Sequence, residues 1–361
     1  MKPKLAIINL DQLGYHTDTY NYCKYLKNDF DITYISFHQG FENIIIDGIK
    51  TVYIPHLKGF WNLLEGYYKL SRILKQCKPD VVFMVYARFI SLIKFFGPSC
   101  PFIFDVRTGS VKQKPLKRKI WNFVLWLESL RFKYITVISE ELRKDLNLPK
   151  RKCYWLPLGG NRNESIKEYS GINLLYLGTL DQRNIHETVE GLAIFKSKHS
   201  NSRLNYDIVG YGKELTEEKL KTTIINCNLK KEVIFHGKVP YDKIDLYLEK
   251  SNIGIVYIPV TSYYNHQPST KLFEFLLAGM PVIATNTSEN KSIVNEDNGI
   301  LIDDNPEAFS IGLEQLCNKT HQFNTEIIRD TVSEFDWEII VKQYLKPLLY
   351  KIVDRKGRII A

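Results

Sequence analysis

Long apolar segments and paired cysteines are both missing from this 361-residue sequence. No run of about 18 apolar residues occurs, so we expect no membrane-spanning helix, and the apolar run at the N-terminus is too short for a signal peptide. The six cysteines are scattered without a Cys-x-x-Cys pair, which favours reduced thiols over a disulfide framework or a zinc site. We therefore expect a cytoplasmic protein.

Motifs of several other protein classes are missing as well. The sequence contains no Cys/His finger, RNA-binding motif or base-reading basic helix, so nucleic acid is not an expected partner. The loop after the first expected strand contains Gly14 but no Gly-x-Gly-x-x-Gly, which argues against a dehydrogenase. Gly14 could instead let the backbone approach a bound substrate closely.

Two series of alternating strands and helices are predicted from the apolar periodicity. In the first series, buried parallel strands are expected at 5–10, 32–36, 81–85, 102–106 and 134–138. After the turn-rich stretch 156–161, strands are expected at 173–177, 206–209, 233–236, 253–257 and 282–285. Two such series predict an α/β fold of two doubly wound, Rossmann-like domains facing a cleft, residues 1–160 and 161–337.

Positive charge is concentrated in the first half of the chain. Residues 1–165 contain 26 Lys and Arg against 14 Asp and Glu, a net charge of +12, whereas the whole chain carries +9. The first half is therefore expected to meet an anionic partner. Five basic residues between positions 112 and 119 lead into an aromatic-rich segment at 120–127, a pattern typical of a helix that binds an anionic membrane surface. The alternative is a core helix with a solvated basic approach.

The most informative segment is 270–284. It predicts a short buried helix that ends at Gly279 and Pro281 and leads into an apolar strand. This helix is apolar except for Lys271 and Glu274 near its start. Because a cation in the first turn opposes the helix dipole by roughly 0.3–1 kcal/mol, Lys271 suggests a ligand whose anionic group offsets it. The alternative is an ion pair between Lys271 and Glu274, worth a few tenths of a kcal/mol.

The same segment resembles the donor site of the retaining glycosyltransferases of family 4, which have the GT-B fold. The matching residues are Lys271, Glu274, Phe275, Ala278, Gly279, Pro281, Val282, Ile283 and Ala284. The resemblance implies that Lys271 binds the diphosphate of a nucleotide sugar and that Glu274 binds the ribose hydroxyls. It also assigns Ser269 and Thr270 to the donor site. Many members have a Glu eight positions before Glu274, where this chain has His266, and this departure leaves the donor sugar open.

Turns after strands of the second domain add candidate donor-binding residues. Gly178 and Arg183 lie in a turn between a strand and a helix, where backbone N–H groups and a guanidinium can bind phosphate. Gly210, Gly237 and Lys238 follow the next two strands, in an order and spacing that the family shares. The alternatives are a solvated loop arginine and glycines that serve only strand-end packing.

In the first domain, Asp105 and Arg107 stand at the end of a buried strand. Charged residues at such positions are candidates for acceptor binding or proton handling, and a buried structural pair is the alternative. Gly14 is included in the donor site as a point of close backbone approach. The resemblance further implies that residues 338–361 form a C-terminal helix that crosses back to the first domain.

The sequence thus predicts a retaining glycosyltransferase that moves a sugar from a nucleotide-diphosphate sugar to a glycan or lipid-linked acceptor. The expected pathway is cell-surface polysaccharide or lipopolysaccharide biosynthesis, with peripheral contact at the cytoplasmic face of an anionic membrane. Arg183, Lys271 and Asp105 are the candidate catalytic residues. No metal or cofactor is expected, because the cations supply the charge and the cleft motifs contain no Asp-x-Asp. A sugar-nucleotide epimerase of the same fold and a non-catalytic sugar-nucleotide-binding protein remain open alternatives.

Overall fold

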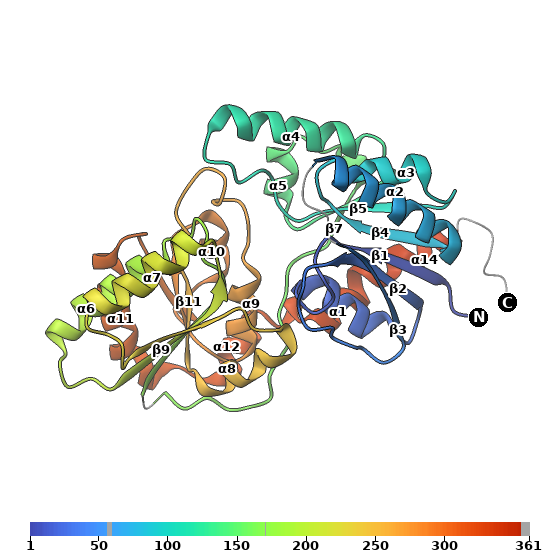
Figure 1. Cartoon of the computed structure of the whole chain (residues 1–361). Coiled ribbons are helices and arrows are strands. Elements are labelled where there is room, and N and C mark those ends of the chain that lie inside the picture. The colour runs from blue at the N-terminus through green and yellow to red at the C-terminus, as the bar shows by residue number, and fades with distance from the viewer. Residues whose placement is uncertain (56–59, 170, 355–361) are drawn as a thin grey trace. The chain divides into compact units, whose positions relative to one another are not determined.

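A computed structural model describes residues 1–55, 60–169 and 171–354 of the chain. The chain divides into two compact units, of which the first comprises Met1–Pro157 with Trp337–Ala361 and the second Leu158–Asp336. Each unit contains one parallel sheet with helices on both faces (Figure 1). The prediction of two doubly wound α/β domains is therefore confirmed. Residues 355–361 of the predicted C-terminal helix lie outside the described residues.

The first unit is built on a seven-stranded sheet with the order β3-β2-β1-β4-β5-β6-β7, in which neighbouring strands pair in parallel. Its strands are β1 (Lys4–Ile8), β2 (Asp31–His38), β3 (Ile49–Pro55), β4 (Val81–Val85), β5 (Phe102–Val106), β6 (Tyr134–Val137) and β7 (Cys153–Trp155). Every residue of β4 and β5 is buried, as expected for central parallel strands covered on both faces.

Helices of the first unit lie on opposite faces of this sheet. In Figure 1, α2 (Phe60–Cys77) and α3 (Ile93–Phe96) cover one face, and α1 (Thr17–Leu26) covers the other together with α14 (Lys346–Asp354). Helix α4 (Pro115–Ser129) connects β5 to β6, and α5 (Glu140–Asp145) follows β6. The hydroxyl of Ser139 accepts a hydrogen bond from the backbone N–H of Leu142, which satisfies one of the unpaired donors at the start of α5.

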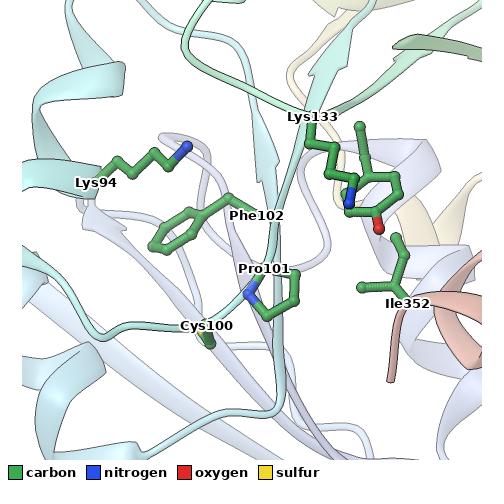
Figure 2. Close-up of a pocket in the computed structure, with 7 residues that line it drawn as sticks. Lys94, Cys100, Pro101, Phe102, Lys133 and Ile352 are labelled. Atoms are coloured by element: carbon green, nitrogen blue, oxygen red, sulfur yellow. The ribbon is translucent and has the colours of Figure 1, made fainter. Parts of the chain in front are cut away.

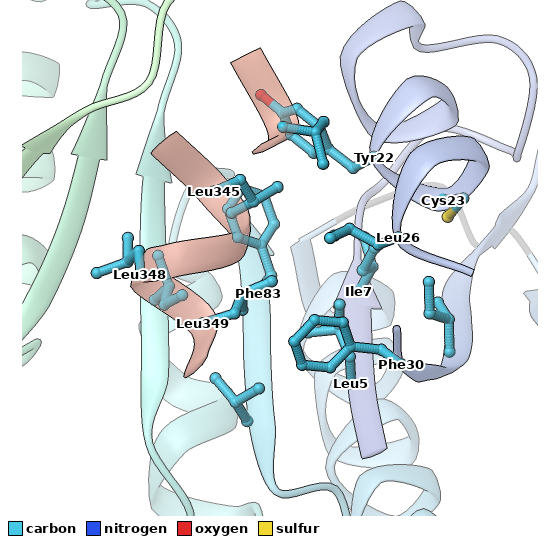
Figure 3. Packing of buried hydrophobic residues seen from close by; sticks show 14 of the residues in the cluster. Leu5, Ile7, Tyr22, Cys23, Leu26, Phe30, Phe83, Leu345, Leu348 and Leu349 are labelled. Carbon is cyan, nitrogen blue, oxygen red and sulfur yellow. The ribbon is translucent and has the colours of Figure 1, made fainter. Parts of the chain in front are cut away.

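The C-terminal helical segment is part of the core of the first unit. It consists of α13 (Trp337–Ile340), a π-helical turn at Val341–Leu345, and α14. The fully buried Trp337 meets Tyr22 of α1 edge-on, with ring centroids 5.8 Å apart. Figure 3 shows leucines of this segment packed with side chains of α1, β1, β4 and the turn between α1 and β2. The labelled residues of this group are Leu5, Ile7, Leu26, Phe30, Phe83, Leu345, Leu348 and Leu349. Because burying each such side chain contributes about 1.5–3 kcal/mol, the segment is firmly held to this unit.

The second unit contains a six-stranded parallel sheet with the order β10-β9-β8-β11-β12-β13. Its strands are β8 (Ile172–Thr179), β9 (Leu204–Tyr211), β10 (Val233–Gly237), β11 (Ile253–Val256), β12 (Val282–Thr285) and β13 (Gly299–Ile302). One face carries α6 (Ile185–Lys198), α7 (Glu214–Asn226) and α11 (Pro306–Lys319), and the other carries α8 (Asp245–Lys250), α9 (Thr270–Leu277) and α12 (Thr325–Asp330) (Figure 1). The short α10 (Ser288–Ile293) follows β12.

Three strands were missed by the sequence prediction, and all three lie at the edge of a sheet. They are β3 and β7 in the first unit and β13 in the second. Edge strands pair on one side only and are less buried, as the mostly half-buried β3 and β7 illustrate. A prediction based on continuous apolar runs therefore favours central strands, although the edge strand β10 was also predicted.

Candidate functional site

The second sheet has one point at which its strand order reverses. From β8 the chain proceeds to β9 and β10 on one side, whereas β11, β12 and β13 extend the sheet on the other. The turn after β8 and the loop after β11 therefore leave the same carboxyl edge from neighbouring strands, which pair at Leu174 and Ile253. In open parallel sheets, ligands bind at this topological switch point.

The end of β8, where Gly178 lies, and the turn that follows it both have unusual backbone conformations. Gly178 has φ of +129°, and Gln182 and Asn184 also adopt left-handed conformations with φ of +59° and +53°. Gly210 of β9 lies in register with Gly178, and a Cβ at position 210 would come within 1.8 Å of the Gly178 carbonyl oxygen. The two predicted glycines are therefore neighbours, and Gly210 lets β8 and β9 end side by side.

Helix α9, which lies between β11 and β12, contributes further predicted site residues. Ser269 stands at its N-cap without a side-chain capping hydrogen bond, and Thr270 is its first residue. The helix ends as the sequence predicted, with Gly279 in the left-handed conformation at φ of +74°. Gly160 packs against the same helix, because a Cβ at position 160 would lie 2.7 Å from Cα of Glu274.

Arg183 and Lys271 meet at the switch point, each resting on an aromatic ring. The guanidinium carbon of Arg183 lies 4.0 Å from the ring centroid of Tyr264, and Nζ of Lys271 lies 3.9 Å from that of Tyr176. Lys271 Nζ also lies against Gly178, 3.2 Å from the position of a Cβ there. The two side chains that the sequence assigned to the diphosphate are thus brought to one place.

Among the described residues, the positive charges of Arg183 and Lys271 are not neutralised by a nearby carboxylate that pairs with the Lys271 ammonium. Burial, and secondly the neighbouring charge of Arg183, hold the pKa of Lys271 well below its usual value, while Glu274 one turn later opposes this shift. Over the part of the chain that the structure describes, the Lys271 ammonium forms no ion pair, and the buried Nη1 of Arg183 has no hydrogen-bond partner. Two like charges held together in this way favour an anion between them.

Glu274 and His266 are two further residues that the sequence assigned to the donor site. Glu274 is 7% exposed on α9, one turn after Lys271. His266 lies in the loop between β11 and α9, and its buried Nδ1 has no hydrogen-bond partner among the described residues. A buried imidazole nitrogen of this kind can donate to or accept from a bound ligand.

Gly237 and Lys238 lie further along the same edge, at the end of β10. Gly237 follows a register irregularity and has φ of +73°, a conformation that glycine adopts without strain. Nζ of Lys238 lies 4.2 Å from the ring centroid of Tyr211 at the end of β9. These residues share the carboxyl edge of the sheet with Gly178 and Gly210.

Asp105 and Arg107 form a buried network in the first unit. Asp105 is fully buried and accepts hydrogen bonds from Nε of Arg107 at 2.7 Å and from the Thr136 hydroxyl at 2.6 Å. Arg107 also pairs with Asp18 at 3.3 Å and contacts the Tyr22 hydroxyl. Burial raises the pKa of Asp105 well above its usual value. These contacts are those of a buried structural pair, which was the alternative interpretation of the sequence. The catalytic role of Asp105 and the acceptor-binding role of both residues stay predictions.

Gly14 belongs to the loop after β1 in the first unit. It has φ of +87°, and a Cβ at this position would overlap the side chain of Ile44. The glycine is therefore needed for packing against the loop between β2 and β3. Its predicted contact with the donor stays a prediction.

A pocket of about 270 Å³ opens at the opposite, amino-terminal edge of the first sheet. Phe102 and Tyr134, the first residues of β5 and β6, line this pocket. Figure 2 shows Phe102 in its wall together with Lys94 and Lys133. The ammonium of Lys94 donates to the carbonyl of Arg131 just beyond the end of α4. None of the predicted site residues lines this pocket.

The aromatic partners of the two cations were not foreseen from the sequence. Tyr176 is a fully buried strand residue, and such tyrosines are usually part of a core. Tyr264 stands two positions before His266, within the loop that resembles the family pattern, and this proximity is the signal that could have identified it.

Comparison with solved structures defines the class of this architecture. A glycosyltransferase from Rickettsia africae is 17% identical, with coverage of 98% of this chain and 99% of that chain and a TM-score of 0.69. Anabaena HepE in complex with UDP and glucose is 14% identical, with coverage of 97% and 100% and a TM-score of 0.73. WaaG, a glycosyltransferase involved in lipopolysaccharide biosynthesis, is 13% identical, with coverage of 99% of both chains and a TM-score of 0.66. The chain has the GT-B fold of these proteins.

The sequence of the second unit is similar to a known family. Residues 161–330, which contain the whole switch-point site, match the model of the family described as glycosyl transferases group 1. No curated protein matches the chain.

Proposed function

We propose that the protein is a retaining glycosyltransferase that transfers a sugar from a nucleotide-diphosphate sugar to a glycan or lipid-linked acceptor. The observation that carries this proposal is the convergence of Arg183 and Lys271 at the switch point of the second sheet, with no ion pair to the Lys271 ammonium among the described residues. A diphosphate bound there would satisfy both cations at once. The matching structure of Anabaena HepE contains UDP and glucose, which supports a nucleotide sugar as donor.

The chemistry follows from this charge arrangement. As the bond between the sugar and the diphosphate breaks, negative charge grows on the leaving group, and cations already fixed beside it stabilise the transition state. A phosphate oxygen of the leaving group takes the proton of the acceptor hydroxyl on the same face of the sugar. This course retains the anomeric configuration. It uses no protein nucleophile, and the two cations replace a divalent metal in the role of charge stabilisation.

The first unit is proposed to recognise the acceptor at a membrane surface. Helix α4 exposes an apolar stripe at alternating spacings of four and three residues, namely Leu116 (72% exposed), Ile120 (49%), Phe123 (56%), Leu127 (43%) and Leu130 (40%) just after its end. Basic residues at its start, Lys114, Lys117 and Lys119, are exposed too. Such an exposed apolar stripe beside lysines fits the surface of an anionic bilayer. In the described ranges, no helix is long and apolar enough to cross a membrane.

The proposal is tested with a panel of nucleotide sugars. A ligand that binds only the folded state raises the melting temperature in a concentration-dependent way, so a thermal-shift screen should identify the donor. A radiolabelled form of that donor then gives transfer or slow hydrolysis with retained configuration. Recovery of an epimerised donor would instead indicate an epimerase, and binding without any turnover would indicate a non-catalytic binding protein.

A further inference from the structure

The first sheet has a switch point of its own, and a single exposed arginine marks it. From β1 the chain proceeds to β2 and β3 on one side, whereas β4 and the later strands extend the other side, so β1 and β4 are neighbours. The loop that leaves the carboxyl end of β4 contains Arg88. By the rule for open parallel sheets, a ligand of the first unit is expected at this loop.

This loop is held in place by groups from two helices. Both carboxylate oxygens of Glu128, a residue of α4 that is only 3% exposed, accept hydrogen bonds from backbone N–H groups, at 2.9 Å from Phe89 and 3.0 Å from Ser91. The hydroxyl of Tyr67 in α2 donates to the carbonyl of Arg88 at 2.8 Å. Burying the Glu128 carboxylate costs desolvation free energy, and its charge-assisted hydrogen bonds restrain the loop backbone strongly.

The backbone conformation of the loop is strained. Phe89 has φ of +64°, in the left-handed region that non-glycine residues seldom adopt. The hydrogen bonds from the backbone N–H groups of Phe89 and Ser91 to Glu128 hold the backbone in this unfavourable conformation. They thereby fix the direction of the Arg88 side chain, which immediately precedes Phe89. Strain maintained at a sheet edge is typical of functional sites.

Arg88 itself is fixed with its charge exposed to solvent. Its guanidinium carbon lies 3.4 Å from the ring centroid of Trp121 on α4, a stacked arrangement. Within the described ranges, no carboxylate lies at ion-pair distance from this guanidinium. Glu128 is committed to the backbone of the loop. The stack covers one face of the guanidinium plane and leaves its edge of N–H donors available for a planar or tetrahedral anion.

We propose that Arg88 binds an anionic group, phosphate or carboxylate, carried by the acceptor. This inference rests on the proposed function, since it assigns the acceptor to the first unit. Arg88 acts by positioning the acceptor and does not touch the reacting atoms. A guanidinium locked on Trp121 loses little side-chain freedom on binding, so it selects a charged acceptor over its uncharged analogue.

The test measures binding of an anionic sugar to the first unit and does not depend on catalytic turnover. All variants carry Arg183→Ala and Lys271→Met, which removes the cations of the second unit as a competing anion site. Binding of glucose 6-phosphate and of glucose is measured by calorimetry and by tryptophan fluorescence at low salt. We expect glucose 6-phosphate to bind at least about 10-fold more tightly than glucose, and Arg88→Gln to abolish this difference, as for the loss of a charge-assisted hydrogen bond. Arg88→Lys should keep part of it.

Arg131→Gln is the matched control. Arg131 is also exposed and also lies over an aromatic ring, that of Phe95 at 5.4 Å. It follows α4, and its Nη1 donates to the Ser91 hydroxyl at 3.3 Å, so this variant removes a cation that touches the β4 loop without belonging to it. Glucose 6-phosphate binding that survives Arg88→Gln, that falls equally with Arg131→Gln, or that never exceeds glucose binding would overturn the proposal. Donor binding in the otherwise unchanged chain is measured separately. An Arg88-dependent phosphate site without any donor binding would refute the proposed function and leave the anion site standing.

Discussion

The ammonium of Lys271 lies 3.9 Å from the centre of the Tyr176 ring, on the strand that leads into the Arg183 turn. A cation over an aromatic ring gains about 0.5–2 kcal/mol, depending on how far it is desolvated. Tyr264 supports Arg183 in the same manner. The two rings explain how two like charges can be held close together in a folded protein before an anion binds.

Removal of either cation should impair catalysis strongly. Arg183→Ala and Lys271→Met should each reduce turnover of the donor roughly 10²–10³-fold, because each removes a charge contact to the departing diphosphate. Lys271→Met should also raise the melting temperature by a few degrees, since a desolvated cation beside Arg183 is replaced by an apolar side chain. Lys198→Met, which removes an exposed cation in the last turn of α6, is the comparison. Wild-type turnover in both main variants would contradict the donor-site assignment.

Donor binding should depend on pH through Lys271. Burial and Arg183 lower the pKa of this ammonium in the free protein, and a bound diphosphate would raise it again. Between the two pKa values binding takes up a proton, so affinity should fall as pH rises through that window, at most tenfold per pH unit. Below the lowered pKa this dependence should vanish. Titration calorimetry with UDP over a pH series measures it, and Lys271→Arg, which stays protonated, should flatten the profile; an unchanged profile would count against the assignment.

The central strands show how much of the fold is encoded locally. β4, β5 and β12 have the bounds that the apolar runs predicted, because strands buried on both faces are continuous stretches of apolar residues. The edge strands β3 and β7 were missed because they carry no such run, whereas β13 is an apolar run of four residues that the prediction overlooked. The π-helical turn at Val341–Leu345 was not foreseen either, since its apolar spacing is also that of an ordinary helix.

Two of the candidate site residues could be predicted because a charge conflicts with its surroundings, and the others rest on turn chemistry and on the family resemblance. Lys271 was noticeable as a cation in the first turn of an apolar helix, and Arg183 as a cation in a strand–helix turn. Tyr176 and Tyr264 gave no such signal, because aromatic residues are ordinary components of strands and loops. Arg88 gave none either, since its importance lies in the Phe89 backbone and the Trp121 stack, which only the tertiary structure reveals.

Glu274 should distinguish ribose from deoxyribose. If its carboxylate accepts the ribose hydroxyls, Glu274→Ala should weaken nucleotide binding more than Glu274→Gln, which keeps one acceptor oxygen. The wild-type protein should bind UDP more tightly than 2′-deoxy-UDP, because a polar group built for a hydroxyl is left without it. Direct binding measurements with both nucleotides decide this, and equal affinity for the two would refute the role.

Activity is expected to be independent of divalent metal. The two cations at the switch point supply the charge that Mg²⁺ or Mn²⁺ would bring to the diphosphate, so turnover should survive exhaustive EDTA treatment. The assay compares EDTA-treated enzyme with and without added metals. Complete loss of turnover that a single divalent ion restores would show that the charge is supplied elsewhere.

The exposed stripe on α4 should bind anionic membranes peripherally. Each near-surface Lys or Arg contributes about 1 kcal/mol, and this attraction decays over about 8 Å at physiological salt, so raised salt should release the protein from vesicles. Neutralising Lys117, Arg118 and Lys119 together should weaken co-sedimentation with anionic liposomes, and Phe123→Ser should weaken it through lost apolar contact. Neutralising the exposed Lys230, Lys231 and Lys250 of the second unit is the control and should have little effect. A core-helix role for α4 predicts no vesicle binding at any salt, and the high exposure of Leu116 and Phe123 argues against that outcome.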